Sequence, residues 1–93
     1  MKNITLNAYL KTRLEDPKFK KAWDESEVLY QITRELIKAR LDKSVSQREL
    51  AKKANTTQAV ISRIENMSVS PSVRLLQKIA SALGKKLEIR FVQ

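Results

Sequence analysis

The stretch from Ser46 to Asn66, which reads "SQRELAKKANTTQAVISRIEN", constrains the fold most, because it holds two short helical patterns on either side of a turn. Ser46 stands three residues before Glu49, and this is the spacing of a capping box, in which both side chains satisfy free backbone N–H groups. The spacing predicts a short helix that ends at about Lys53. Asn55 follows where the chain must turn sharply, and asparagine tolerates the left-handed conformation better than any residue except glycine.

A second helix is predicted after Thr57, its expected N-cap, and the two faces of this helix differ in chemistry. With about 100° between successive residues, one face is apolar apart from its capping threonine and carries Val60, Ile61 and Ile64. The opposite face carries short hydrogen-bonding side chains and one arginine: Gln58, Ala59, Ser62, Arg63 and Asn66. In a major groove, amides can bond adenine, arginine can bond guanine or phosphate, and alanine can contact the thymine methyl group. The two helices and the asparagine turn therefore predict a helix-turn-helix that reads DNA.

The charge of the whole chain favours the same kind of partner. Among 93 residues, 19 are Lys or Arg and 10 are Asp or Glu, so the net charge is +9. This excess favours a polyanion, with nucleic acid first and an acidic protein or a membrane surface second. Four basic side chains could add phosphate contacts or be ordinary solvated surface: Lys43, Arg48, Lys52 and Lys53. A basic membrane or RNA binder stays open as an alternative, and it would bind in a salt-sensitive but sequence-indifferent way.

The composition excludes several other classes of function. With no cysteine and no histidine, the chain has no disulfides, no thiolate metal sites and no histidine to serve as general base or metal ligand. The single glycine, Gly84, rules out a glycine-rich phosphate loop. An enzyme is not expected, since a carboxylate pair such as Glu25 and Glu27 would not share a helix face; we expect no metal and no cofactor. No apolar run approaches the roughly 20 residues of a membrane span, and no signal-peptide pattern is present, so we expect a cytoplasmic protein.

The residues before this unit also carry helical patterns. Leucines and one tyrosine stand at helical spacing, at Leu6, Tyr9, Leu10 and Leu14, until Asp16 and Pro17 form a helix-start signature. From Pro17 a helical pattern runs to about residue 44, either unbroken or with a break near residues 24–26. Its apolar residues form two stripes about 100° apart: Leu29, Ile32, Leu36 and Ala39 in the first, and Tyr30, Ile37 and Leu41 in the second. We expect the first stripe to face the domain core, and a helix with two apolar faces needs two neighbours.

The end of the chain is predicted to form one more helix and a strand. In "SPSVRLLQKIASALG", Ser70 and Pro71 open the helix and Gly84 closes it. In "KLEIRFV", apolar and charged residues alternate, with Leu87, Ile89 and Phe91 on one face, and this alternation predicts a β-strand. Since an open strand edge invites pairing, we expect this strand to pair with a second copy or a partner; the alternative is pairing with residues 3–6 of the same chain.

Residues 46–66 resemble the helix-turn-helix of the phage-repressor (Cro/XRE) family, whose pattern is Thr-Gln-x-x-Leu-Ala, a glycine-containing turn, and Ser-Gln-x-x-Ile-Ser-Arg-Ile-Glu. The resemblance spans about residues 32–84, with Asn55 at the usual turn glycine and Met67 where glycine often follows the second helix. It implies that Gln47 contacts a phosphate, which also suits a helix N-terminus. It further implies a groove-facing set of Thr57, Gln58, Ala59, Ser62 and Arg63, and packing between the two helices by Leu50, Ala51, Ile61 and Ile64. With the strand added, the expected fold is all-α: a lambda-repressor-like five-helix DNA-binding domain with an extra N-terminal helical segment and one C-terminal β-strand.

The flanking segments "DPKFKKAW" and "ALGKKLEIRF" resemble those of HigA-type antitoxins of toxin–antitoxin systems. This resemblance implies a dimer that binds operator DNA, represses its own operon and neutralises a RelE/HigB-like mRNA interferase; the alternative is a stand-alone phage-like repressor. We expect an N-terminal extension at 1–26, the DNA-binding domain at 27–84 and a partner- or dimer-contacting strand at 85–93. The candidate partner-binding residues are Phe19, Trp23, Tyr30, Leu87, Ile89 and Phe91. The three aromatic residues among them could instead pack under Tyr9 and Leu10 in the chain's own core.

Overall fold

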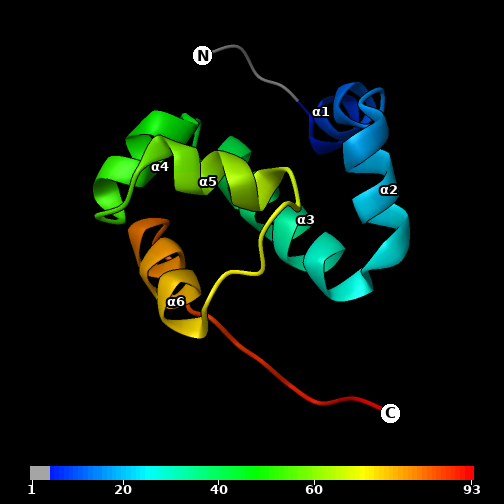
Figure 1. Cartoon of the computed structure of the whole chain (residues 1–93). Coiled ribbons are helices and arrows are strands. Elements are labelled where there is room, and N and C mark those ends of the chain that lie inside the picture. Colours follow the sequence, from blue (N-terminus) through cyan, green and yellow to red (C-terminus); the bar gives the residue numbers. More distant parts are fainter. Residues whose placement is uncertain (1–4) are drawn as a thin grey trace.

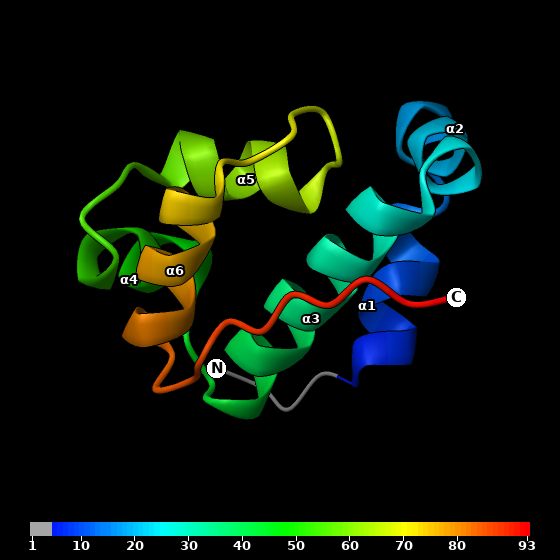
Figure 2. The ribbon, with the colours of Figure 1, turned by 90° about the horizontal axis from the view of Figure 1, so that it is seen from below.

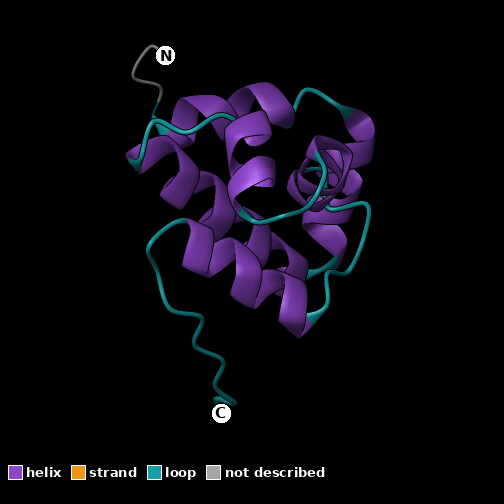
Figure 3. Ribbon diagram, turned by 90° about the vertical axis from the view of Figure 1, so that its left-hand side faces the viewer, coloured by secondary structure: helices purple, strands orange, loops and turns teal. Residues whose placement is uncertain are grey.

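A computed structural model describes residues 5–93, and within this range the chain forms six helices and no strand (Figure 1, Figure 3). The helices are α1 (Leu6–Arg13), α2 (Pro17–Glu25), α3 (Glu27–Asp42), α4 (Gln47–Lys53), α5 (Gln58–Glu65) and α6 (Val73–Ala82). Figure 2 shows α3 at the centre, with α1 and α2 on one side of it and α4, α5 and α6 on the other. The predicted all-α character is confirmed, and α3 has the two neighbours that its two apolar stripes require.

The two sides of α3 bury two separate apolar clusters. The first, here called the bundle core, consists of Leu36, Val45, Leu50, Ala51, Ala54, Ile61, Ile64, Ile79 and Leu83. The second, here called the extension core, consists of Leu10, Phe19, Ile37 and Met67, with eight partly buried neighbours around them from α1 and its C-cap, α2 and α3. Ile32 and Ala39 pack on the bundle core and Tyr30 and Leu41 on the extension core, as the stripes predict.

Leu29 is an exception, because it packs on the extension core although its helical angle places it in the first stripe. It lies in the first turn of α3, directly after α2, and angular position alone does not decide which neighbour is present at the end of a helix. The break between α2 and α3 falls at Ser26, whose side chain accepts a hydrogen bond from the Leu29 N–H at 3.2 Å.

Two parts of the expected fold are wrong. Residues 85–93 form no strand, and within the described chain no segment pairs with them. Alternation gives an extended segment two faces, but a strand also needs a partner for its backbone groups, and the described residues supply none. Residues 3 and 4 of the alternative pairing segment lie outside the described range, and Leu6 belongs to α1. The DNA-binding domain at 27–84 also contains four helices, α3 to α6, rather than five.

The helix boundaries follow the predicted local signals with one shift. Ser46 and Glu49 form both arms of the capping box, and Asn55 takes the left-handed conformation at φ 55°. Gly84 also closes α6 in that conformation, at φ 67°. The N-cap of α6 is Ser72 rather than Ser70, because the Ser72 hydroxyl accepts from the Leu75 N–H at 3.1 Å. The sequence offers two serines with the chemistry of a cap, and the fold uses the second.

Candidate nucleic-acid interface

Helices α4 and α5 and the turn between them make up the predicted helix-turn-helix. The turn closes when the Thr56 N–H donates to the Ala51 carbonyl at 2.9 Å, just after Asn55 in its left-handed conformation. Four side chains lie buried where the two helices meet, and each is at most 3% exposed: Leu50, Ala51, Ile61 and Ile64. The expected packing between the helices is confirmed, and it fixes the angle at which α5 presents its outer face.

The outer face of α5 is open to solvent. The Thr57 hydroxyl caps the helix by accepting from the Val60 N–H at 3.2 Å. Of the six candidate DNA-binding residues on α5 and its two caps, Ser62 is half-buried and the other five are exposed: Thr57, Gln58, Ala59, Arg63 and Asn66. These side chains come from one helix and its two caps, so the structure brings them together on a single surface with no carboxylate of α5 among them.

Gln47 connects the start of α4 to the end of α5. It is half-buried, and its Nε2 donates to Glu65 Oε1 at 3.0 Å. A glutamine amide carries two N–H donors, so the second one remains for an anion. Arg48, the next residue, is exposed. Lys43 lies elsewhere, because its Nζ is 3.5 Å from where a Cβ on Gly84 would stand, at the carboxyl end of α6.

Glu65 is fully buried and sits at the centre of a network of hydrogen bonds. Arg40 of α3 pairs with it in two-pronged fashion, with Nε 2.8 Å from Oε2 and Nη2 3.0 Å from Oε1. The remaining amino group of Arg40 donates to the Val45 carbonyl at 3.1 Å. Tyr9 of α1 donates its hydroxyl proton to Glu65 Oε1 at 3.1 Å and accepts from Arg40 Nη2 at 3.1 Å. Four helices therefore meet at one carboxylate: α1, α3, α4 and α5.

The carboxyl end of α5 is held by two further contacts. The Thr33 hydroxyl donates to the Ile64 carbonyl at 2.9 Å, and Arg13 Nη2 donates to the Glu65 carbonyl at 3.1 Å. Among the described residues, no buried side-chain nitrogen or oxygen lacks a hydrogen-bond partner. A buried ion pair is costly unless its polar atoms are satisfied in this way.

The environment of the network shifts the pKa of two of its groups. Burial raises the pKa of Tyr9, and the neighbouring Glu65 carboxylate raises it further, because both disfavour a phenolate. Burial alone lowers the pKa of Arg40, but the hydrogen bonds and the charge of Glu65 outweigh it and the net pKa is raised. The phenol is thus held neutral and the guanidinium charged.

The sequence pattern of the helix-turn-helix family matches residues 36–89, which is more than half of the chain. The chain belongs to the helix-turn-helix family. The match is of the Cro/XRE type, whose members are DNA-binding transcription regulators. Comparisons with curated proteins and with solved structures returned no match. No helix within residues 5–93 of this helix-turn-helix protein is long and apolar enough to cross a membrane.

Sequence reasoning missed the network of the helix-turn-helix protein, although a signal was present. Glu65 follows Ile61 by four residues and therefore falls in the apolar stripe of α5, while Arg40 follows Leu36 by four and falls in an apolar stripe of α3. Opposite charges on two stripes that face one core indicate a buried pair. No comparable sequence pattern predicts the hydrogen bonds of Tyr9 and Arg13, because the positions of these side chains depend on how α1 docks.

The candidate partner-binding residues fall into two groups. In the extension, Phe19 is buried at 2% exposure, and Trp23 and Tyr30 are half-buried with their ring centroids 4.1 Å apart. In the tail, Leu87 is half-buried, whereas Ile89 is 58% and Phe91 101% exposed. The structure therefore places the first group in the extension core and leaves most of the second group open.

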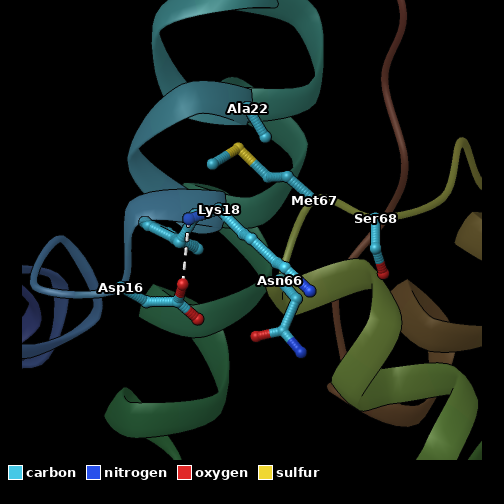
Figure 4. Close-up of a pocket in the computed structure, with 7 residues that line it drawn as sticks. Asp16, Lys18, Ala22, Asn66, Met67 and Ser68 are labelled. Atoms are coloured by element: carbon cyan, nitrogen blue, oxygen red, sulfur yellow. Dashed lines mark hydrogen bonds between the residues drawn. The ribbon is translucent and has the colours of Figure 1, made fainter.

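A pocket of about 260 Å³ lies between the start of α2 and the turn that follows α5 (Figure 4). Phe19, Ala22 and Met67 give it apolar walls, and Asp16, Lys18, Asn66 and Ser68 add polar groups. Met67 takes the left-handed conformation at φ 57° and is 4% exposed, so its side chain fills the extension core where a glycine would leave space. In Figure 4 the side chain of Lys18 extends toward Asn66, the C-cap of α5.

Proposed function

We propose that the protein is a repressor that binds operator DNA as a dimer through α5 and is also the antitoxin of a RelE/HigB-like mRNA interferase. Membership of the helix-turn-helix family supports the DNA-binding half of this proposal. The observation that carries it is the open face of α5, where amide, hydroxyl and guanidinium groups stand on a rigidly packed helix. The net charge of +9 adds attraction to the phosphate backbone.

The proposed base-reading side chains lie on the exposed face of α5, with Gln58 and Arg63 the strongest candidates. Gln58 has the geometry to bond adenine and Arg63 to bond guanine, while Gln47 and Arg48 at the start of α4 contact phosphates. The proposed DNA-binding set is Lys43, Gln47, Arg48, Thr57, Gln58, Ala59, Ser62, Arg63 and Asn66. Lys43 is its most distant member, since its amino group lies beside Gly84.

The test of base reading compares affinity for the protein's own promoter with affinity for random DNA. Gln58→Ala and Arg63→Ala should each weaken operator binding by about 1–3 kcal/mol. Gln31→Ala, which removes an exposed glutamine from α3, is the matched control and should leave binding unchanged. Equal losses on operator and random DNA would show that these residues contact the backbone alone.

Dimerisation follows from the geometry of the duplex. Two recognition helices about 34 Å apart read successive major grooves, and a single α5 reads half a site. The exposed tail residues Ile89 and Phe91, with Leu87 beside them, are the proposed contacts with a second copy or a partner, which would cover apolar surface now open to water. Light scattering of the purified chain, with and without operator DNA, measures the oligomeric state directly.

The antitoxin half rests on the flanking segments and on the aromatic residues Phe19, Trp23 and Tyr30. Aromatic side chains anchor protein interfaces well, and Trp23 and Tyr30 keep part of their surface exposed. Phe19 would reach a partner only if α2 moved away from α3, since its ring is 2% exposed. We therefore assign residues 1–26 a partner-binding role, 27–84 the DNA-binding role and 85–93 a dimer- or partner-contacting role.

Co-purification decides between an antitoxin and a stand-alone repressor. The chain is expressed with its neighbouring reading frames, and this protein alone carries the tag. A stoichiometric small basic protein that is toxic when expressed without it supports the antitoxin. The burial of Phe19 favours the second candidate, a repressor without a toxin. A dimer that elutes alone and shifts its own promoter DNA would establish that candidate.

A further inference from the structure

We propose that Tyr9 of α1 is a positioning residue for DNA binding, which acts through Glu65 to fix the side chain of Gln47. Tyr9 lies outside residues 36–89, the span of the helix-turn-helix family, and it does not belong to the face of α5. The proposal rests on the proposed contact of Gln47 with a DNA phosphate. It gives the N-terminal extension a part in DNA binding without contact with DNA.

The geometry of one carboxylate oxygen carries the argument. Glu65 Oε1 accepts from the Tyr9 hydroxyl at 3.1 Å, from Arg40 Nη2 at 3.0 Å and from Gln47 Nε2 at 3.0 Å. Three donors occupy the acceptor sites of this oxygen, so its position and its orientation are set by all three together. The direction of the Gln47 amide depends in turn on where Oε1 stands.

The role of Gln47 depends on both hydrogens of its amide. One hydrogen is directed at Glu65 Oε1, and planarity of the amide then fixes the direction of the second, which is the donor available to a phosphate. When the Tyr9 hydroxyl is removed, Arg40 still holds both oxygens and Gln47 still holds Oε1, so the carboxylate rotates toward these remaining donors. The Gln47 amide follows that rotation, and its second N–H no longer points at the place of the phosphate.

The rest of α1 stays in place when the hydroxyl is lost. Leu10 is buried in the extension core at 6% exposure, and Arg13 holds the Glu65 carbonyl at 3.1 Å. The change Tyr9→Phe therefore removes one hydroxyl and leaves the helix docked. Thr12→Val is a control on the same helix, because Thr12 is exposed and its hydroxyl donates to the Ala8 carbonyl of α1 itself at 3.2 Å.

The experiment measures the affinity of each variant for promoter DNA over a range of salt concentrations, at a temperature where all variants are fully folded. Tyr9→Phe should weaken binding about threefold to tenfold, the size of one hydrogen bond. The slope of log K against log salt should stay unchanged, because the Gln47 amide is neutral and its contact with a phosphate releases no counterion. Thr12→Val should leave the affinity unchanged. A purely structural role for Tyr9 would lower the free energy of unfolding and leave the affinity of the folded protein unchanged.

A double-mutant cycle with Gln47→Ala separates the possible failures. If the inference holds, Tyr9→Phe has no further effect on affinity once Gln47 is alanine. An effect that persists in that background, or no effect in the wild-type background while Gln47→Ala weakens binding, would overturn the positioning role and leave the phosphate contact standing. If Gln47→Ala itself leaves the affinity unchanged, the proposed phosphate contact fails and the positioning role fails with it.

Discussion

At the scale of single residues, the stability of the helix-turn-helix depends on Glu65, because the charge of this residue is buried and paired with Arg40. Glu65→Ala leaves the Arg40 guanidinium, whose side chain is 4% exposed, without its partner, and this should cost about 3–5 kcal/mol in a urea titration. Replacing both members with apolar residues, Arg40→Met with Glu65→Leu, should be less costly than the single change. The control is Asp24→Ala, which breaks an exposed pair with Lys20 and should cost at most about 1 kcal/mol. Equal losses for Glu65→Ala and Asp24→Ala would contradict the prediction.

The Tyr9 phenol should report on the same network through its pKa. Burial and the Glu65 carboxylate raise that pKa above its ordinary value of 10.0, so folding favours the neutral phenol. The stabilisation is therefore complete below about pH 10 and is lost as the pH rises through the raised pKa of the folded state. In the Tyr30→Phe variant Tyr9 is the one tyrosine left, and its phenolate absorbance should appear at higher pH in the native protein than in urea. Coincident titrations would show that the hydroxyl is not held in the network.

The capping box of α4 makes a prediction at the scale of an element. A hydrogen bond from the Ser46 backbone lowers the pKa of Glu49, and the Ser46 side chain lowers it further. The stabilisation is present above the ordinary pKa of 4.5 and is lost as the pH falls through the lowered value. The melting temperature of wild type should exceed that of Glu49→Gln at pH 6, and the difference should shrink as the pH falls below 4.5. A difference that does not change with pH would assign the stabilisation to helix propensity rather than to the ionised box.

At this scale, the sequence predicts elements well where the deciding contacts are local. The cap at Ser46, the turn at Asn55 and the helix end at Gly84 each depend on a few neighbouring residues, and all three are confirmed. The strand at 85–93 depended on a distant partner, and the prediction was wrong. The difference lies in the backbone, because a helix satisfies its own N–H and C=O groups whereas a strand needs another strand.

For the molecule as a whole, the sequence predicts the surface of the site better than what supports it. The polar face of α5 follows from the period of one helix, and the structure leaves that face open. The hydrogen-bond network that holds α5 joins Tyr9, Arg40 and Glu65, which are far apart in the chain. They come into contact because α1 and α3 dock where they do. Periodicity does not predict these contacts, because they depend on the mutual orientation of the helices rather than on the sequence pattern of any one helix.

That docking predicts that the extension and the helix-turn-helix unfold as one unit. Phe19 of α2 packs with Leu10 of α1, Ile37 of α3 and Met67 of the turn after α5, so the extension core spans both parts of the chain. Phe19→Ala should lower the free energy of unfolding by about 3–5 kcal/mol. Helix content from circular dichroism and fluorescence of Trp23, the single tryptophan, should report one coincident transition, both in wild type and in the variant. Separate transitions, or a small loss of stability, would show that α1 and α2 fold apart from α3, and Phe19 would then be available to a partner rather than committed to the core.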